Sequence, residues 1–304
     1  MIIVYLLLFP VFVYIFFPTI WFHPFSGITE ALQIMGHYPF DVTTFFMGKT
    51  VHSLMTPWYY FPVWMAITIP IGWLIFFLSG VLFMAFRLPI YFKQNDFALW
   101  LSIWLWLLLP IFSVVFFGSN LYEDGRHLFF VLPPFLILAV EGFQSLIHLN
   151  FRKKICSKIV KITSWVVLLE TVISVSIFSV YDHPFQYAYF NDIGRKFAFE
   201  DFDKDYWGLS YRNALEFLVR YDSRSEIDVN WMVDPGEWNL IWLNSEDRGR
   251  LHYVQFDQCE YHITNYRSQQ PVDVSAEKIY EIKVQDVVIM AIYKMHPPNK
   301  HSNS

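Results

Sequence analysis

Five stretches of the chain are long, apolar and nearly free of charge. The first, residues 1–22, contains no Asp, Glu, Lys or Arg, and about 20 residues suffice for a helix to cross the roughly 30 Å hydrocarbon core of a bilayer. A secretory signal peptide would begin with basic residues and end at a small-residue cleavage site, and both are missing here. The other spans are predicted at residues 58–86, 97–117, 128–147 and 162–180.

The charges between these spans predict how the chain crosses the membrane. The connection at residues 87–96 carries two basic residues, and that at 148–161 carries five basic residues and no acid. Connections rich in Lys and Arg are retained on the cytoplasmic side. Five crossings then place the outer loops 21–57 and 118–126, and the whole tail from residue 181, on the opposite side.

The charge composition changes at residue 181 and divides the chain into two predicted domains. Only 16% of all residues are charged and 55% are hydrophobic, whereas soluble domains average about a quarter charged residues. Residues 181–304 hold 20 Asp and Glu against 13 Lys and Arg, a formal balance of −7. We therefore expect an α-helical multi-pass membrane domain at residues 1–180 and an acidic, extracytoplasmic domain at 181–304. Neither half offers an extended basic face, so nucleic-acid binding is disfavoured.

The tail has the pattern of a small α/β or α+β domain. In the segment YWGLSYRNALEFLVRY the apolar residues fall on one helical face. Strands are predicted at residues 227–233, 238–243, 252–256, 260–265, 278–284 and 287–293, the last two as a hairpin. In the first outer loop, apolar residues 28, 31, 32 and 35 predict a short amphipathic helix on the membrane surface, and an irregular loop fits the short pattern equally well.

The second outer loop gathers four titratable side chains directly before a predicted span. They are Glu123, Asp124, Arg126 and His127. A guanidinium at the membrane surface can bind a phosphate through two parallel hydrogen bonds, and a neighbouring carboxylate can act as a general base or hold the Arg in place. The alternative is a solvated turn whose charges stabilise helix ends.

Aromatic residues gather at the outer end of the second predicted span. Trp58, Tyr59 and Tyr60 follow Lys49 and His52 in the segment GKTVHSLMTPWYY. Trp and Tyr commonly anchor helices at the membrane interface, and aromatic surfaces also hold sugars and apolar chains. Both interpretations are compatible with the segment.

The remaining polar residues in or near the membrane are assigned structural roles or none. A charge at the bilayer centre costs about 2.5–3.5 kcal/mol on insertion scales, so Glu170 is expected to face the bundle or to be protonated, and to form a hydrogen bond with a nearby Ser or Thr. Glu141, nearer the cytoplasmic end, is assigned no role. Cys156 and Cys259 fall on opposite sides of the membrane and cannot pair. The outer histidines lack ligand spacing, so we expect neither a metal nor another cofactor.

Four segments resemble, in order, one family of membrane enzymes. They are FFMGKTVHSLMTPWYYFPVWMAITIP, NLYEDGRHLFFVLPP, HPFQYAYFND and DYWGLSYRNA. These resemble the membrane-bound, polyprenyl-phosphate-sugar-dependent glycosyltransferases, which include protein O-mannosyltransferases and lipid A aminoarabinose transferases. The likeness extends over nearly the whole chain, through the tail segments CEYHITNYR and KIYEIKVQDVVIMAIYK. It is greatest to bacterial members that end in a small periplasmic domain.

The resemblance implies a GT-C fold, in which a lipid-linked sugar enters from the membrane and is transferred to an acceptor on the outer face. It also implies that basic residues hold the departing phosphate. The residues that this implication assigns to substrate binding are Arg126, His127, Lys49, His52, Trp58, Tyr59 and Tyr60, with the three aromatics lining the sugar or lipid passage.

The resemblance also implies an acid in a first outer loop that serves as catalytic base or as a ligand of the acceptor and sugar. That motif is not matched here, because all recognisable segments belong to the family's C-terminal half. The candidates that remain for the base are Asp124, Glu123 and Asp41.

Two functions follow as hypotheses. The first is a glycosyltransferase of a bacterial inner membrane, or the C-terminal half of one acting with a separate N-terminal polypeptide, with the tail in the periplasm. The second is a non-catalytic membrane protein that binds a lipid-linked sugar or a partner. Transport is least favoured, because no inverted repeat or pair of broken, polar spans is visible.

Overall fold

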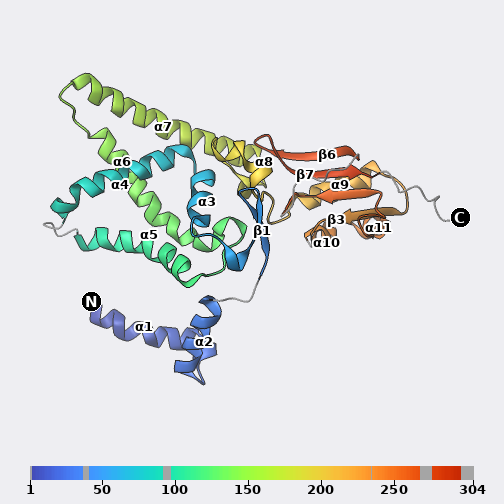
Figure 1. Ribbon diagram of the computed structural model, residues 1–304, viewed down its shortest axis with the longest axis horizontal. Helices are drawn as coiled ribbons and strands as arrows, with labels where there is room; N and C mark the ends of the chain where they lie inside the picture. The colour runs from blue at the N-terminus through green and yellow to red at the C-terminus, as the bar shows by residue number, and fades with distance from the viewer. Residues whose placement is uncertain (1, 37–40, 92–96, 234, 268–275, 296–304) are drawn as a thin grey trace.

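The computed structural model describes residues 2–36, 41–91, 97–233, 235–267 and 276–295. A helical half occupies most of the chain up to α7 and a smaller half built on a sheet follows it (Figure 1). The connection between α6 and α7, which carries the basic residues, lies at the end of the helical half far from the sheet. The hairpin β1–β2 and helix α3 lie at the end next to the sheet (Figure 1).

The chain begins with two helices and a hairpin. Helix α1 (Ile2–Phe16) leads through a 3₁₀ turn, η1 (Pro18–Ile20), to α2 (Pro24–Gly36). Helix α2 covers the positions at which the amphipathic helix was predicted, so the helix is confirmed over the irregular loop, and its place on the membrane surface stays a prediction. Strands β1 (Thr43–Phe46) and β2 (Lys49–His52) then form an antiparallel hairpin that is followed by η2 (Ser53–Met55).

The second predicted span is divided into two helices. Helix α3 (Tyr60–Thr68) ends at Ile69, whose backbone is extended, and α4 (Ile71–Tyr91) begins after Pro70. The ring of a proline disfavours helical backbone in the residue before it and removes a hydrogen-bond donor. The single helix predicted over residues 58–86 is therefore wrong at this point.

The remaining helices of this half are α5 (Phe97–Phe117), η3 (Glu123–Val131), α6 (Leu132–Ile147) and α7 (Lys154–Tyr181). In the described part of the chain, three helical stretches are long and apolar enough to cross a membrane: Phe97–Phe117, Glu123–Ile147 and Lys154–Tyr181. Two of the predicted spans correspond only to the shorter apolar helices Leu7–Phe16 and Ile71–Arg87. The chain thus has the helices of a membrane protein.

Helices α4 and α6 make the closest helix pair of this half. A Cβ atom on Gly142 would lie 1.9 Å from the carbonyl oxygen of Phe76, and one on Gly80 would lie 2.0 Å from that of Leu138. Small residues that let backbones touch are the usual means of helix association in lipid, where apolar side chains gain little by leaving the solvent.

The two acids predicted inside spans have structural partners. Arg87 donates to Glu141 across the α4–α6 contact, at 3.3 Å. Glu170 is exposed on α7, so the prediction that it faces the bundle is wrong. The predicted local hydrogen bond is present, because Ser174 donates to the Oε1 atom of Glu170 one turn away, at 2.6 Å.

A connecting segment after α7 packs back onto the helical half. It contains η4 (Gln186–Ala188), η5 (Gly194–Lys196) and α8 (Ala198–Asp201). The amide of Asn191 donates to the carbonyls of Ala66 and Ile69, each at 2.7 Å. Carbonyls in the last turn of a helix have no partner within the helix, so Asn191 provides the hydrogen bonds that the end of α3 lacks. Phe190, Ala198 and Phe202 belong to the same buried core as the helices.

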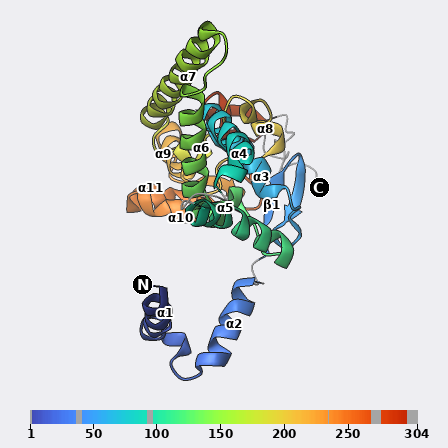
Figure 2. The same cartoon turned by 90° about the vertical axis from the view of Figure 1, so that its left-hand side faces the viewer.

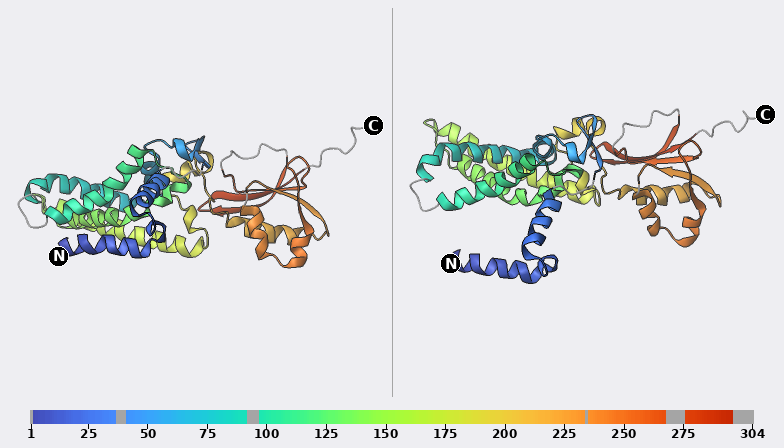
Figure 3. Two further views of the ribbon diagram at one scale, coloured as in Figure 1. Left: turned by 90° about the horizontal axis from the view of Figure 1, so that it is seen from below. Right: turned by 60° about the horizontal axis from the view of Figure 1, so that its bottom comes forward.

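The sheet half consists of a five-stranded mixed sheet with its helices on one side (Figure 3). Its elements are α9 (Ser210–Tyr221), β3 (Ile227–Trp231), α10 (Pro235–Trp238), η6 (Asn239–Trp242), α11 (Ser245–Arg250), β4 (Leu251–Tyr253), β5 (Tyr261–Thr264), β6 (Glu277–Val284) and β7 (Val287–Lys294). The strand order is β4-β3-β5-β7-β6, with β3 parallel to both its neighbours and the other pairs antiparallel. A small α/β or α+β domain was predicted, and a separate region with a sheet and its own helices is present.

Most predicted elements of this half are present, and one is wrong. Helix α9 and strands β3 to β7 fall on the predicted stretches, and Gln285 and Asp286, both with positive φ, form the predicted turn of the β6–β7 hairpin. Residues 238–243, predicted as a strand, instead form the end of α10 and η6. Pro235 at the first position of α10 favours a helix start, and the run that follows lacks strand alternation.

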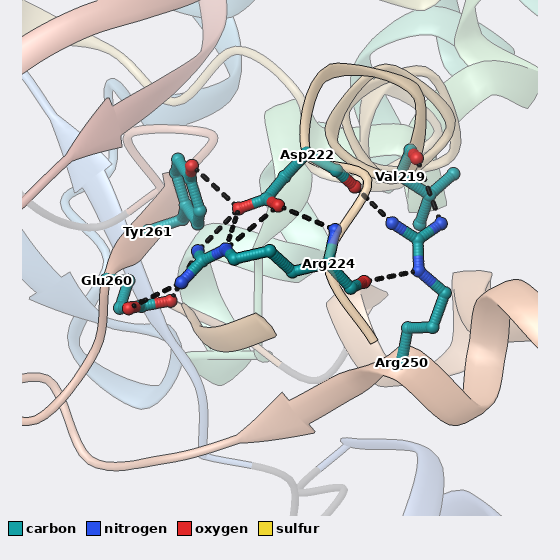
Figure 4. Close-up of polar contacts among 6 residues, drawn as sticks. All are labelled: Val219, Asp222, Arg224, Arg250, Glu260 and Tyr261. Atoms are coloured by element: carbon teal, nitrogen blue, oxygen red, sulfur yellow. Dashed lines mark hydrogen bonds and ion pairs between the residues drawn. The ribbon is translucent and has the colours of Figure 1, made fainter. Parts of the chain in front are cut away.

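A charged network closes the C-terminal end of α9 (Figure 4). Arg250 donates to the carbonyl of Val219 at 3.0 Å and also to that of Asp222, so it satisfies the last carbonyls of the helix. Arg224 donates to Asp222 at 3.0 Å and to Glu260 at 2.7 Å, and Tyr261 donates to Asp222 at 3.0 Å. Hydrogen bonds from Arg224 hold the pKa of Asp222 well below its ordinary value.

Candidate functional site

A cavity of about 580 Å³ lies where the helical half meets the connecting segment. Its wall is almost entirely apolar, and it is shared by α3, the start of α4, η3, α6 and the segment around η4. The lining residues are Phe61, Met65, Thr68, Ile69, Pro70, Trp73, Asp124, Phe129, Leu132, Phe135, Leu136, Gln186, Tyr187, Tyr189, Tyr206 and Trp207. Asp124 is the one ionisable acid in this wall.

The loop that carries Asp124 has an unusual backbone. Glu123, Asp124 and Gly125 have φ values of 49°, 56° and 77°, a left-handed conformation that non-glycine residues rarely adopt. A Cβ atom on Gly125 would lie 2.7 Å from the ring of Phe61, so only glycine fits between the loop and α3. Strained backbone of this kind persists where the surrounding structure holds it, and here it turns Asp124 toward the cavity.

The carboxyl group of Asp124 is incompletely paired. Its Oδ1 atom is buried and has no hydrogen-bond partner among the described residues. A buried polar atom without a partner costs roughly 1–3 kcal/mol, and buried polar atoms without partners are rare in native proteins. A hydroxyl group of a bound molecule would provide the missing donor.

Arg126 lies at the rim of the cavity. Its guanidinium pairs with Glu123 at 2.5 Å and stacks over the ring of Trp207 at 4.6 Å. Trp207 is itself part of the cavity wall, so Arg126 borders the cavity without lining it. Arg267, which follows β5, donates to the other oxygen of Glu123 at 2.9 Å and to the carbonyl of Tyr206 at 3.1 Å. Glu123 is thus shared by an arginine of each half.

The other predicted polar residues lie on the hairpin or on the surface. Asp41 pairs with His52 at 3.1 Å, and both side chains are about half exposed. Lys49 is exposed at the start of β2. None of these three residues lines the cavity, whereas Asp124, another of the predicted base candidates, does. His127 packs its ring against Tyr122, with the ring centres 4.6 Å apart.

The predicted aromatic residues do not line this cavity. Tyr60 is fully buried and packs against Phe46 and Trp64, whereas Trp58 is 69% exposed and contacts the ring of Tyr59. The aromatic wall comes instead from four residues of the helical half and four that follow α7, which are Phe61, Trp73, Phe129, Phe135, Tyr187, Tyr189, Tyr206 and Trp207. Tyr187 and Tyr189 lie in the segment HPFQYAYFND, and Tyr206 and Trp207 lie in DYWGLSYRNA. Both segments contributed to the family resemblance, but none of these four residues was predicted for the site.

Lys204 is a buried cation next to the site. Its side chain is enclosed, donates to the carbonyls of Phe199 and Phe202, and lies beside Asp124 in a second, much smaller cavity. Burial lowers the pKa of Lys204 to about 8. Its neighbour Asp205 is fully buried and accepts from the hydroxyls of Tyr187 and Ser210. Neither residue was among those predicted for the site.

Within the described residues, no group of three or more His, Cys, Asp or Glu is placed to hold a metal ion. Comparisons of the chain with protein-family models, with curated proteins and with solved structures find no match.

Proposed function

We propose that the chain is a membrane glycosyltransferase, or the C-terminal half of one, that transfers a sugar from a polyprenyl-phosphate donor to an acceptor at the outer face of the membrane. The observation that carries the proposal is the apolar cavity of about 580 Å³ with the unpaired carboxyl oxygen of Asp124 in its wall. The resemblance of four sequence segments to polyprenyl-phosphate-sugar-dependent glycosyltransferases also supports the proposal.

The apolar wall suits a prenyl chain, and its position suits entry from lipid. Phe129 and Leu136 line the cavity and are also exposed on the outside of the helical half. A lipid-borne ligand could therefore reach the cavity sideways from the hydrocarbon layer. Pockets that bind small molecules are typically apolar with a few placed polar groups, as here with Asp124, Gln186 and the tyrosines.

In the proposed reaction Asp124 is the general base. Its carboxylate takes the proton of the acceptor hydroxyl, the acceptor oxygen bonds to the anomeric carbon, and the bond from that carbon to the phosphate oxygen breaks. The electron pair leaves with the polyprenyl phosphate. Arg126 then stabilises the added negative charge, for which it must turn from Glu123 toward the cavity rim.

One observation favours the alternative of a non-catalytic binding protein. Arg126 is already neutralised by Glu123 and covered by Trp207. If it stays in that position, the cavity retains an apolar lipid chain but provides no stabilisation for a leaving phosphate. The two functions therefore differ in whether transfer occurs, and they agree that a polyprenyl phosphate binds.

The test uses membranes that carry the chain, alone and with a separately supplied N-terminal half. Labelled sugar transfer from a polyprenyl-phosphate donor is compared for wild type, Asp124→Asn and Arg126→Gln. Asp228→Asn, an exposed acid of β3, is the matched control. We expect the two site variants to lose transfer by about 100-fold, the usual magnitude for a catalytic acid or base, and the control to keep it. Binding of polyprenyl phosphate with no transfer under either condition would instead establish the binding protein.

A further inference from the structure

The sheet half exposes a group of large apolar residues close to the cavity. The exposed fractions are 51% for Trp207, 67% for Trp238, 71% for Ile241 and 61% for Trp242, and Leu209 is also exposed. Exposed single apolar residues are ordinary, but a cluster of this kind on a soluble surface usually marks a contact site. We call these five residues the aromatic patch.

The aromatic patch is held rigidly. The amide of Asn239 donates to the carbonyl of Gly208 at 3.1 Å and to that of Pro235 at 2.7 Å, which ties the segment of Trp207 and Leu209 to α10. Arg248 donates to the carbonyls of Leu240 and Leu243, each at 3.1 Å, and so fixes η6 from its other end. The exposed side chains therefore project from an ordered backbone.

The patch adjoins the cavity. Trp207 belongs both to the patch and to the cavity wall, which Phe129 and Leu136 also line, and those two residues are in addition exposed on the outside of the helical half. Helix α11, which follows η6 directly, projects to one side of α5 and α6 in the view along the helices (Figure 2).

The charges beside the patch are compatible with a headgroup layer. Arg212 stacks over Trp242 at 4.7 Å and pairs with Glu216, and Arg248 lies on the other side of η6. Glu237 is the acid within the patch itself. Trp with flanking Arg is the composition that proteins use at the membrane interface, where the ring is partly apolar and the headgroups accept hydrogen bonds.

We infer that the aromatic patch rests on the outer leaflet of the bilayer beside the mouth of the cavity. The sheet half then has two attachments to the membrane, one through α7 and one through Trp238, Ile241 and Trp242. The inference is independent of whether the chain transfers a sugar.

Spin labelling tests the inference without any need for activity. The probe is a nitroxide on Ile241→Cys in a Cys156→Ser background, since the native Cys259 is buried and leaves the label site unique. The matched control is Glu277→Cys at the start of β6. That residue is exposed and lies about 25 Å along the hairpin from the turn that contacts the helical half. Both proteins are reconstituted in nanodiscs of equal parts phosphatidylcholine and phosphatidylglycerol.

Collision of the label with oxygen, which concentrates in lipid, is compared with collision with a water-soluble nickel chelate. We expect the ratio of oxygen to nickel accessibility at position 241 to exceed that at 277 by at least about threefold, and to fall when Trp238 and Trp242 are both changed to Ser. Equal ratios at 241 and 277 would overturn the inference. So would a label at 241 that neither reagent reaches, because that result indicates a protein partner or a second copy on the patch.

Discussion

The two halves of the molecule are held together by different kinds of contact. In the helical half the closest approach is between backbones, at Gly80 and Gly142, and many large apolar side chains point outward although an aromatic core is buried around Trp64. In the sheet half the large apolar residues of α9 and of the strands form an enclosed core, and charged groups such as Asp222 and Arg224 close its edge.

The difference follows from the two solvents. Water drives apolar side chains together and tolerates charged networks at a surface, so the sheet half gains stability from burial and from ion pairs. In lipid there is no hydrophobic driving force that brings apolar side chains together, so the association of the helices depends on close backbone packing. We therefore expect substitutions that add volume between helices to destabilise the helical half. In the sheet half we expect substitutions that remove a paired charge to be destabilising.

The largest effect is expected for Gly142→Leu. Its side chain would occupy the position of the Phe76 carbonyl, 1.9 Å from the added Cβ, so α4 and α6 must separate. Overpacking of a well-packed site costs typically 1–3 kcal/mol, and because backbone is displaced here we expect at least about 3 kcal/mol. The measurement is the thermal midpoint of the detergent-solubilised protein. Gly249→Leu, whose Cβ would meet no atom within 4 Å, is the control and should leave the midpoint unchanged. A normal midpoint for Gly142→Leu would mean that the helices do not pack as described.

A smaller effect, of about 2 kcal/mol, is expected for Asp222→Asn, because charged hydrogen bonds contribute roughly 1.5–3 kcal/mol. The pKa of Asp222 is lowered by folding, so its contribution is present above its ordinary value of 3.8 and is lost as the pH falls below that value. The free energy of unfolding of the sheet half, followed by its aromatic fluorescence, should differ between wild type and variant at pH 7, and the difference should shrink below about pH 4. Asp228→Asn is the control. A pH-independent difference would show that the charge of Asp222 is not the cause.

The smallest effect is expected for the ion pair that joins the two halves, whose coupling free energy should be about 1 kcal/mol. The pair Arg267–Glu123 is largely buried, with side chains 16% and 14% exposed. A double-mutant cycle with Arg267→Gln and Glu123→Gln should show a coupling of that size in the unfolding free energy. The exposed pair Arg195–Asp192 provides the comparison, and its coupling should be close to zero. Additive effects in the first cycle would mean that the two halves are not linked through Glu123.

The elements that depend on local pattern could be predicted, and those that depend on one residue's context were missed. The β6–β7 hairpin follows from two β-branched runs and a two-residue turn, and α9 follows from one apolar face. The break between α3 and α4 was also visible in principle, since Ile69 precedes Pro70, but the high apolarity on both sides concealed it. The incorrect strand at residues 238–243 arose because its apolar residues suggested burial, whereas Trp238, Ile241 and Trp242 are exposed.

The candidate site shows the same limit. Asp124 and Arg126 could be selected from the sequence because charged residues directly before an apolar span are unusual. Tyr187, Tyr206 and Trp207 could not, because they reach the cavity only through a chain reversal after α7 that no local pattern encodes. Lys204 was missed for a related reason: a lysine between two aspartates resembles a surface position, and its burial depends on the distant rings of Phe199 and Tyr266.

The connecting segment leaves the sheet half little freedom to swing. Asn191 is bonded to the end of α3, and the side chain of Gln285 accepts from the backbone of Phe190 at 3.1 Å, so the segment is fastened from both halves. The same segment provides Tyr187 and Tyr189 to the wall of the cavity. The sheet half and this part of the cavity wall are therefore rigidly connected. The shape of the cavity depends on where the sheet half is held, and not on the membrane helices alone.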